Sequence, residues 1–346
     1  MRPPPERREL PLALSMGEPA GIGPDITLMA WRDRRHGIPP FYVIGDGALF
    51  RNRAALLRID APVVETTPAE AAGVFERALP LVPVGLPVRA TPGKPDDSSG
   101  PAAIAAIRMA AADALNGRCA AMVTNPIAKT VLYGAGFTDP GHTEFLAKLA
   151  SETAGSRCHP VMMLWAHDLA VIPVTIHIPL RDVTSQLTTP LIVQTGRIAA
   201  RDLASKFGIA RPRLAVSGLN PHAGESGTIG DEERTVIAPA VAQLAADGID
   251  VRGPLPADTM FHKAARARYD AALCMYHDQA LIPIKMHAFD SAVNVTLGLP
   301  FVRTSPDHGT AFDIAGTGRA NPSSLIAALT LAARIATQTP ALAPAQ

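Results

Sequence analysis

The stretch LAVIPVTIH, residues 169–177, is a run of apolar residues that ends in a histidine. A short apolar run bounded by polar residues is typical of a strand that is buried on both faces of a parallel sheet. Other runs follow the same pattern, and we expect strands at 10–16, 41–46, 120–124, 161–166, 213–219, 270–277 and 292–298. The chain therefore predicts a sheet whose strands end in polar side chains.

Stretches with the helical spacing of apolar residues lie between these runs. The clearest helices are expected at 100–117, 189–208 and 232–248, and the last two end in glycine, as helices commonly do. Alternation of strands and helices predicts an α/β fold with a largely parallel sheet. A chain of 346 residues is long for one core, so we expect two domains, at 1–130 plus 298–346 and at 131–297.

The composition is that of a globular protein, with 47% apolar and 18% charged residues and a net charge of +1. This charge offers no basic field for nucleic acid. No apolar run approaches the roughly 18 residues that a membrane span needs, and no apolar signal segment follows the N-terminus. Three distant cysteines without a CxxC pair suggest buried thiols in a reducing compartment. We therefore expect a cytoplasmic protein that binds neither nucleic acid nor membrane.

Three histidines share one sequence context. His177, His222 and His277 each follow an apolar run, and each has a carboxylate nearby in the sequence, namely Asp182, Glu225 and Asp278. Loops at the carboxyl ends of parallel strands converge at one edge of the sheet, where three imidazoles can hold a metal ion and leave a position open for substrate. Their spacing matches no local zinc motif, so histidines that hydrogen-bond the loop backbone are an equally simple interpretation.

Further polar residues favour an anionic substrate. GHTEF, with His142 and Thr143, and RTSPDHG, with Arg303, are expected to be polar loops. Lys285 and Arg303 flank the expected strand that carries Asn294. Cations, an amide and a hydroxyl together suit a phosphate ester, although each residue alone is more often simply exposed. GEPAGIGPD, residues 17–25, lacks the GxGxxG spacing and the later acidic residue of a Rossmann site, so we expect a tight turn or a helix start there.

Several longer motifs resemble the 4-hydroxythreonine-4-phosphate dehydrogenase family of pyridoxal 5′-phosphate biosynthesis. They are GEPAGIGPD, GHTEF, GLNPHAGE (218–225), GPLPADTMF (253–261), MYHDQALIPIK (275–285) and VNVTLGLPFVRTSPDHGTA (293–311). The resemblance implies two α/β/α domains like those of isopropylmalate dehydrogenase, with the active site in the interdomain cleft at the interface of a homodimer. It also implies metal ligands drawn from both subunits (His177, His222, His277) and substrate contacts from His142, Thr143, Lys285, Asn294 and Arg303.

The stretch HGTAFDIAGTGRANP, residues 308–322, is similar to the adenosine-binding loop of isopropylmalate and isocitrate dehydrogenases. The similarity implies cofactor contacts from His308, Gly309, Asp313 and Asn321. Asp313 matches an acid that accepts the ribose 2′-hydroxyl of NAD and would repel the 2′-phosphate of NADP. We therefore expect NAD to be preferred, with NADP as the alternative, and Phe312 departs from the proline usual in those enzymes.

The resemblance implies oxidation of the phosphorylated hydroxyamino acid at carbon 3 and then loss of carbon dioxide. The metal is expected to be zinc, with magnesium or cobalt as alternatives. Lys285 is either the proton acceptor or a charge partner for the substrate, and Asp258 and Asp278 are expected to orient the metal ligands. Threonate or erythronate phosphate, a cis-dihydrodiol, hydrolysis at a three-histidine metal site and a metal-binding interaction module are the competing interpretations.

Overall fold

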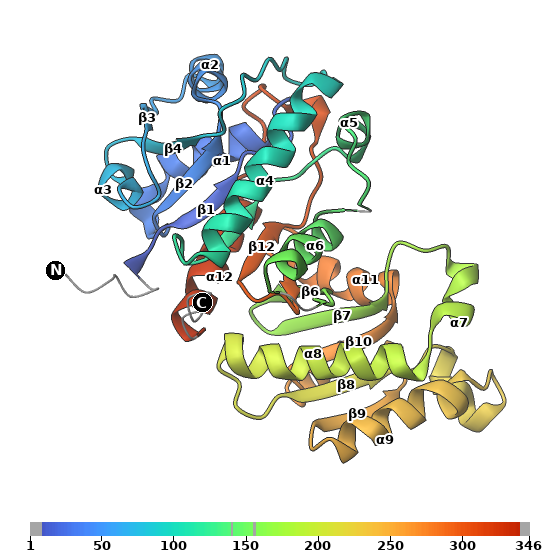
Figure 1. The fold of residues 1–346 in the computed structure, drawn as a ribbon. Coiled ribbons are helices and arrows are strands. Elements are labelled where there is room, and N and C mark those ends of the chain that lie inside the picture. Colours follow the sequence, from blue (N-terminus) through green and yellow to red (C-terminus); the bar gives the residue numbers. More distant parts are fainter. Residues whose placement is uncertain (1–8, 140, 155–156, 340–346) are drawn as a thin grey trace. The chain divides into compact units, whose positions relative to one another are not determined.

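The computed structural model describes residues 9–139, 141–154 and 157–339 (Figure 1). The chain divides into two compact units, here called unit 1 (1–160 with 299–346) and unit 2 (161–298). Each unit contains a largely parallel sheet with helices packed on it, which confirms the expected two-part α/β architecture.

The sheet of unit 1 has the strand order β3-β4-β2-β1-β5-β12, and all neighbouring strands are parallel. The strands are β1 (Leu12–Ser15), β2 (Phe41–Gly45), β3 (Val63–Glu65), β4 (Leu79–Pro83), β5 (Met122–Thr124) and β12 (Arg303–Pro306). The order reverses between β1 and β5, so the segments that follow these two strands lie side by side at the carboxyl edge. Ligands commonly bind at such a reversal.

The helices of unit 1 cover this sheet. They are α1 (Gly23–Arg32), α2 (Gly47–Leu57), α3 (Ala71–Phe75), α4 (Gly100–Leu115), α5 (Lys129–Gly134), α6 (His142–Ala154) and α12 (Ser323–Gln338). The helix α4 packs on β1 and β2 through small residues such as Ala103, Ala106 and Ala110, which are fully buried. The helix α12 packs on β12 and β5.

The sheet of unit 2 has the order β11-β6-β7-β10-β8-β9. Its strands are β6 (Val161–Ala166), β7 (Leu169–Thr175), β8 (Arg213–Ser217), β9 (Asp250–Leu255), β10 (Ala271–Tyr276) and β11 (Val293–Leu297). The pairs β11–β6 and β6–β7 are antiparallel, and the other pairs are parallel. The part of the sheet that ends in the predicted metal ligands is therefore parallel, as expected.

Unit 2 contains the helices α7 (Val183–Gln186), α8 (Thr189–Phe207), α9 (Ala238–Ala246), α10 (Lys263–Arg266) and α11 (His277–Ala288). The helix α8 packs across β6, β7, β8 and β11, and α11 packs on β6, β7 and β10. Ala280 and Ile284 of α11 join Leu164, Val171 and Cys274 in a buried apolar cluster. This packing fixes the start of α11, where His277 stands.

Comparison with the sequence-based expectations shows where they hold. Every expected strand and helix is present, with the helix expected at 232–248 beginning as a short π-helical turn (Glu233–Ile237) before α9. The first boundary between the units lies at 160/161, later than the expected 130/131, because α5 and α6 pack against α4 of unit 1. The second boundary lies at 298/299, next to the expected position.

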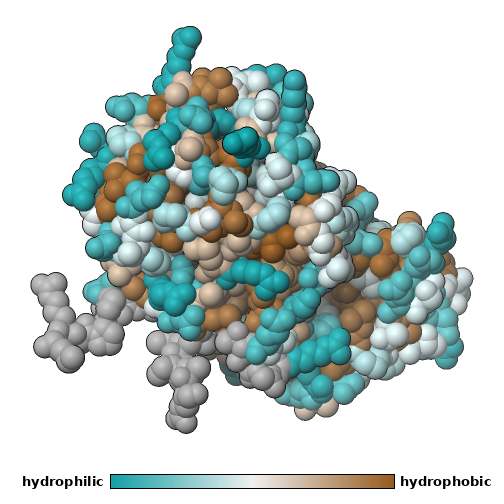
Figure 2. All heavy atoms as spheres, turned by 45° about the horizontal axis from the view of Figure 1, so that its top comes forward, coloured by the Kyte–Doolittle hydropathy of each residue, from teal (hydrophilic) through white to brown (hydrophobic). Residues whose placement is uncertain are grey.

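The surface is mixed in character. Figure 2 shows hydrophobic areas interrupted by hydrophilic residues on the face in view, as is usual for globular proteins. Across the parts of the chain that the structure describes, none of the helices has both the length and the apolar character required to cross a bilayer.

Candidate active site

Three adjacent parallel strands of unit 2 carry the predicted metal ligands. The strand β10 lies between β7 and β8. His277 directly follows β10, His177 stands two residues after β7, and His222 lies in the turn η5 (Pro221–Gly227) after β8. The ring centroids of His177 and His277 are 5.7 Å apart. All three histidines thus follow strands at the carboxyl edge of the sheet, as the strand-end rule predicts, and two of them lie close together.

Two of the three histidines are held by carboxylates. The Nδ1 atom of His222 lies 2.6 Å from Oε1 of Glu225, and Nδ1 of His277 lies 2.6 Å from Oδ1 of Asp278. A carboxylate on Nδ1 places the proton there and leaves the lone pair on Nε2 for a metal ion. The hydrogen bond to Glu225 also raises the pKa of His222, with a smaller contribution from Asp258.

The backbone at two of these histidines is strained. His177 and His222 both have φ of 54°, in the left-handed region that non-glycine residues seldom adopt. Such a conformation costs on the order of 1–3 kcal/mol and tends to occur where function requires a particular side-chain direction. The strain at both positions is consistent with a functional role for these two side chains.

Two residues that the sequence reasoning did not select hold this edge together. Gln279 accepts hydrogen bonds at Oε1 from the backbone N–H of Met275 (2.6 Å) and from the Ser217 hydroxyl (2.7 Å). Glu233 accepts at Oε1 from the backbone N–H groups of Leu219 (2.8 Å) and Asn220 (2.7 Å). Gln279 lies in the MYHDQALIPIK motif, and this motif could have drawn attention to it. Glu233 lies in the helix expected at 232–248, where no motif marks it.

A single chain brings only part of the predicted metal site together. His177 and His277 line one pocket of about 310 Å³, and His222 is not among its lining residues. Within the described residues, no three His, Cys, Asp or Glu side chains are close enough to hold a metal ion. Asp182, which the sequence places near His177, forms an ion pair with Arg181 (3.6 Å).

Unit 1 contains a buried cationic group. Arg303 on β12 is buried and donates from Nη2 to the Thr124 hydroxyl (2.6 Å). Burial lowers the pKa of Arg303 to about 10, with Glu144 acting in the opposite direction. Burial, and then the charge of Arg303, hold the pKa of His142 well below its usual value of 6.5.

His142 and Thr143 are the first two residues of α6, so GHTEF starts a helix where we expected a loop. The Nε2 atom of His142 is buried and has no hydrogen-bond partner among the described residues. A neutral imidazole with an unsatisfied nitrogen, beside a buried guanidinium, offers donors and charge to the oxygens of an anion.

Lys285 and Asn294 belong to unit 2, and Asn294 lies in the strand expected at 292–298. Arg303, in contrast, lies on β12 of unit 1 where we expected a polar loop. Lys285 is on α11, where its Nζ lies 5.2 Å from the ring centroid of Phe289. Asn294 is on β11, and its Oδ1 is buried without a hydrogen-bond partner in the described part of the chain. The helix α11 was not expected because Pro283 lies inside it.

The predicted cofactor residues lie in the loop of unit 1 between β12 and α12. Asp313 is exposed in a short 3-10 turn (Phe312–Ile314). Asn321 accepts from the backbone N–H of Ser323 (3.0 Å) at the start of α12. His308 contacts the carbonyl oxygen of Gly309 through Nδ1 (3.0 Å), and its Nε2 is buried without a partner among the described residues.

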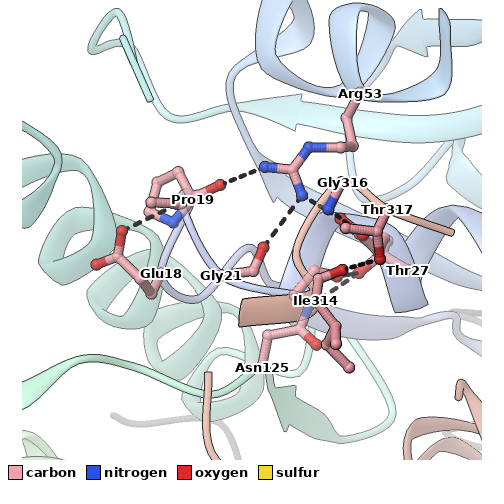
Figure 3. A network of polar contacts seen from close by, with 12 residues as sticks. Glu18, Pro19, Gly21, Thr27, Arg53, Asn125, Ile314, Gly316 and Thr317 are labelled. Carbon is pink, nitrogen blue, oxygen red and sulfur yellow. Dashed lines mark hydrogen bonds and ion pairs between the residues drawn. The ribbon is translucent and has the colours of Figure 1, made fainter. Parts of the chain in front are cut away.

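Figure 3 shows how this loop meets the GEPAGIGPD segment. That segment forms a turn and then the start of α1, as expected, with Gly17 at φ of 72°. A Cβ at Gly17 would lie 2.6 Å from the carbonyl oxygen of Pro126, so only glycine fits there. The backbone N–H of Ile22 donates to the carbonyl oxygen of Thr310 (2.9 Å), which joins the turn to the cofactor loop.

Comparisons with known proteins show the family of the chain. A family model described as "Pyridoxal phosphate biosynthetic protein PdxA" matches residues 38–332. A protein of Bradyrhizobium diazoefficiens named 4-hydroxythreonine-4-phosphate dehydrogenase is 64% identical over 335 residues, which cover 94% of this chain and 97% of the relative. The chain belongs to the PdxA family.

Solved structures place the fold in the same PdxA family. A crystal structure of 4-hydroxythreonine-4-phosphate dehydrogenase from Klebsiella pneumoniae is 40% identical, with a TM-score of 0.84 and coverage of 94% of this chain and 99% of that one. A terephthalate 1,2-cis-dihydrodiol dehydrogenase from Burkholderia xenovorans LB400 is 28% identical, with a TM-score of 0.63 and coverage of 94% and 98%. The PdxA match includes every predicted site residue, whereas GEPAGIGPD precedes it.

Proposed function

We propose that this PdxA-family chain oxidises 4-phosphooxy-L-threonine at its carbon-3 hydroxyl to 2-amino-3-oxo-4-phosphooxybutanoate. This β-keto acid then loses carbon dioxide to give 3-amino-2-oxopropyl phosphate, in pyridoxal 5′-phosphate biosynthesis. The names of close relatives support the reaction. The observation in this chain that carries the proposal is the buried Arg303 beside the neutral His142, because a buried guanidinium is well suited to a phosphate group.

We propose that His177, His222 and His277 hold a divalent metal ion, zinc or alternatively magnesium or cobalt. The donor set fits, since neutral imidazoles are ligands for such ions and carboxylates hold Nδ1 of two of them. When bound, the ion would act as a Lewis acid that lowers the pKa of the substrate hydroxyl. Asp278 would then fix the ring of His277, and Glu225 that of His222. Asp258, whose charge also acts on His222, stays a proposed orienting residue.

A homodimer is the proposed active form, with metal ligands supplied by both chains. One chain does not assemble the three-ligand group within its described residues. The helix that begins with His277 carries an exposed apolar stripe of Ile282, Met286 and Phe289, which are 66%, 87% and 71% exposed. These residues are spaced four and three positions apart and so lie on one face of α11. A second copy that covers this stripe would lie close to His277.

The proposed substrate contacts are His142, Thr143, Arg303, Lys285 and Asn294. Arg303 and His142 would bind phosphate oxygens, and the buried Oδ1 of Asn294 would accept a hydrogen bond from a substrate donor. Lys285 is the proposed proton acceptor at Nζ, and it would return a proton to carbon after decarboxylation. A role for Lys285 as a charge partner of the substrate is the alternative.

NAD is the proposed hydride acceptor, bound by residues 308–322 through His308, Gly309, Asp313 and Asn321. The exposed carboxylate of Asp313 supports NAD over NADP, because it would repel a 2′-phosphate. When bound, the nicotinamide would accept the hydride from carbon 3. A cytoplasmic location, expected from the sequence, is part of the proposal.

A substrate panel tests the proposed function. Purified protein with a defined metal content is given NAD and, in turn, 4-phosphooxy-L-threonine, threonate phosphate, erythronate phosphate and a cis-dihydrodiol, and the absorbance of reduced nicotinamide is followed. We expect the phosphorylated amino acid to be oxidised most efficiently. The similarity to a dihydrodiol dehydrogenase makes that substrate class the second candidate. Product release without NAD reduction would instead indicate a metal-dependent hydrolase.

A further inference from the structure

We infer that Asp25 and Arg53 are positioning residues for the dinucleotide, acting through the segment 308–322, here called the cofactor segment. The inference rests on the proposed function, since it takes this segment to be the NAD site. Asp25 and Arg53 are 0% and 2% exposed, so neither is accessible to a dinucleotide itself. Their effect on binding must therefore pass through the backbone that they hold.

The two residues form a buried ion pair between α1 and α2. Figure 3 shows Arg53 with its contacts to Pro19 and Gly21. Taking two charges out of water is costly unless each finds further hydrogen-bond partners. Arg53 has them, because Nη1 donates to the carbonyl oxygen of Gly21 (3.1 Å) and Nη2 to that of Pro19 (2.9 Å). The guanidinium thus holds the GEPAGIGPD turn against α2.

Asp25 supplies the link to the cofactor segment. Its Oδ1 faces Arg53, and its Oδ2 accepts from the backbone N–H of Gly316 (2.7 Å). Gly316 has φ of 73°, and a Cβ there would lie 2.8 Å from Cβ of Pro92, so only glycine fits at this point. One oxygen of Asp25 thus binds Arg53, and the other binds the cofactor segment.

One of the proposed cofactor residues, Asp313, lies between the two anchors. Thr310 is held by Ile22, and Gly316 is held by Asp25. Between them, Ala311 adopts the left-handed region with φ of 43°, and Asp313 projects to solvent. A strained residue keeps its conformation only where the surrounding structure fixes it. Releasing Gly316 would consequently let the position of Asp313 vary.

Two conservative variants test this inference. Asp25→Asn keeps the shape but has one acceptor oxygen in place of two, so it cannot accept from both Arg53 and Gly316. Arg53→Lys keeps the charge but loses the planar fork that reaches Pro19 and Gly21 together. Asp113→Asn is the matched control, since Asp113 is also a buried acid of unit 1. Its carboxylate pairs with Arg118 (2.6 Å) and accepts from the Tyr42 hydroxyl (2.6 Å), and these bonds do not reach the cofactor segment.

Binding of NAD to metal-loaded protein without substrate is measured by calorimetry, together with amide hydrogen exchange across 310–316 in the cofactor-free protein. We expect both variants to weaken NAD binding by roughly tenfold to a hundredfold, because a loosened segment must be ordered again when the dinucleotide binds. Exchange at Gly316 should become faster. Because the variants leave the substrate contacts intact, KM for NAD should rise while kcat at saturating NAD changes little.

Folded variants with wild-type NAD affinity and wild-type exchange at Gly316 would overturn the inference. An equal loss of NAD affinity in Asp113→Asn would also overturn it, because the effect would then be one of general stability. If Asp25→Asn does not fold, Arg53→Lys decides by the same two measurements. A wild-type protein that binds no dinucleotide would refute the proposed function as well, which separates that failure from a failure of this inference alone.

Discussion

Gln279, on the first turn of α11, donates from Nε2 to the carbonyl oxygen of Gly218 after β8, over 2.8 Å. The same side chain accepts from the backbone N–H of Met275 near the end of β10 (2.6 Å). It therefore ties together the two strand ends from which His222 and His277 arise. The amide can do both because it carries N–H donors and a carbonyl oxygen, whereas a glutamate carboxylate at this position would lack the donor.

Replacing Gln279 by methionine should weaken metal binding by roughly 10–100-fold, as loss of residues that orient metal ligands commonly does. The cause would be relaxation of the turn that carries His222 relative to the start of α11. Metal affinity is measured by competition with a chelator. Gln243→Met, at an exposed position on α9, is the control. Wild-type affinity in Gln279→Met would show that this tie does not position the ligands.

Replacing Arg303 by methionine should weaken binding of the phosphorylated substrate by roughly a hundredfold, because truncating one partner of a buried charge pair costs about 2–5 kcal/mol. The free energy of unfolding should change little, since burying a guanidinium is itself unfavourable. Calorimetric titration and chemical denaturation measure the two quantities, with the exposed Arg77→Met as control. A variant that lost stability but kept its substrate affinity would contradict the assigned role.

The stability of the protein should fall as pH decreases below about 6.5, partly because of His142. The folded-state pKa of His142 is depressed by burial and by Arg303, with Glu144 also close to Arg303. The unfolded state therefore takes up the proton first as pH falls, so stability is lost below the ordinary pKa. We expect His142→Asn to reduce this loss in thermal unfolding between pH 5 and 8. The exposed His36→Asn should leave the pH profile unchanged.

Placing a charge on the stripe of α11 should separate the proposed dimer. Met286→Glu would put a carboxylate on the surface that we propose a second copy covers, and burial of an unpaired charge is strongly unfavourable. Light scattering should then report a monomer, and bound metal should be lost with it. The control is Val64→Glu, which places the same charge on another exposed apolar residue. Val64 lies on the edge strand β3 and is 39% exposed. A metal-loaded monomer would contradict the shared site.

The fold could be predicted where strands are continuous apolar runs, and not elsewhere. β12 reads RTSP and is fully buried without a single large apolar residue, so no hydrophobic pattern marks it. β4 contains Pro80 and Pro83, which argue against a strand, and β3 is largely exposed. The helix α11 contains Pro283, and tertiary packing of Ala280 and Ile284 outweighs that local signal.

Part of the site could be predicted as well. The expectation that His177, His222 and His277 follow strand ends is met, because in a parallel sheet such positions share one edge, and their role as metal ligands stays a prediction. The contacts of Glu233 and Gln279 could not be foreseen, since they depend on which backbone groups the folded turns leave unpaired. The ion pair of Asp25 and Arg53 was equally hidden, because nothing in a single sequence shows that two charges will be buried together.

Metal content of the purified protein with His277 replaced by alanine, determined by elemental analysis alongside NAD reduction, tests the central claim most directly. The account predicts that this variant loses its bound divalent ion and its ability to reduce NAD together, whereas the exposed His36→Ala keeps both. A folded His277→Ala protein that retains the ion and still reduces NAD would contradict it.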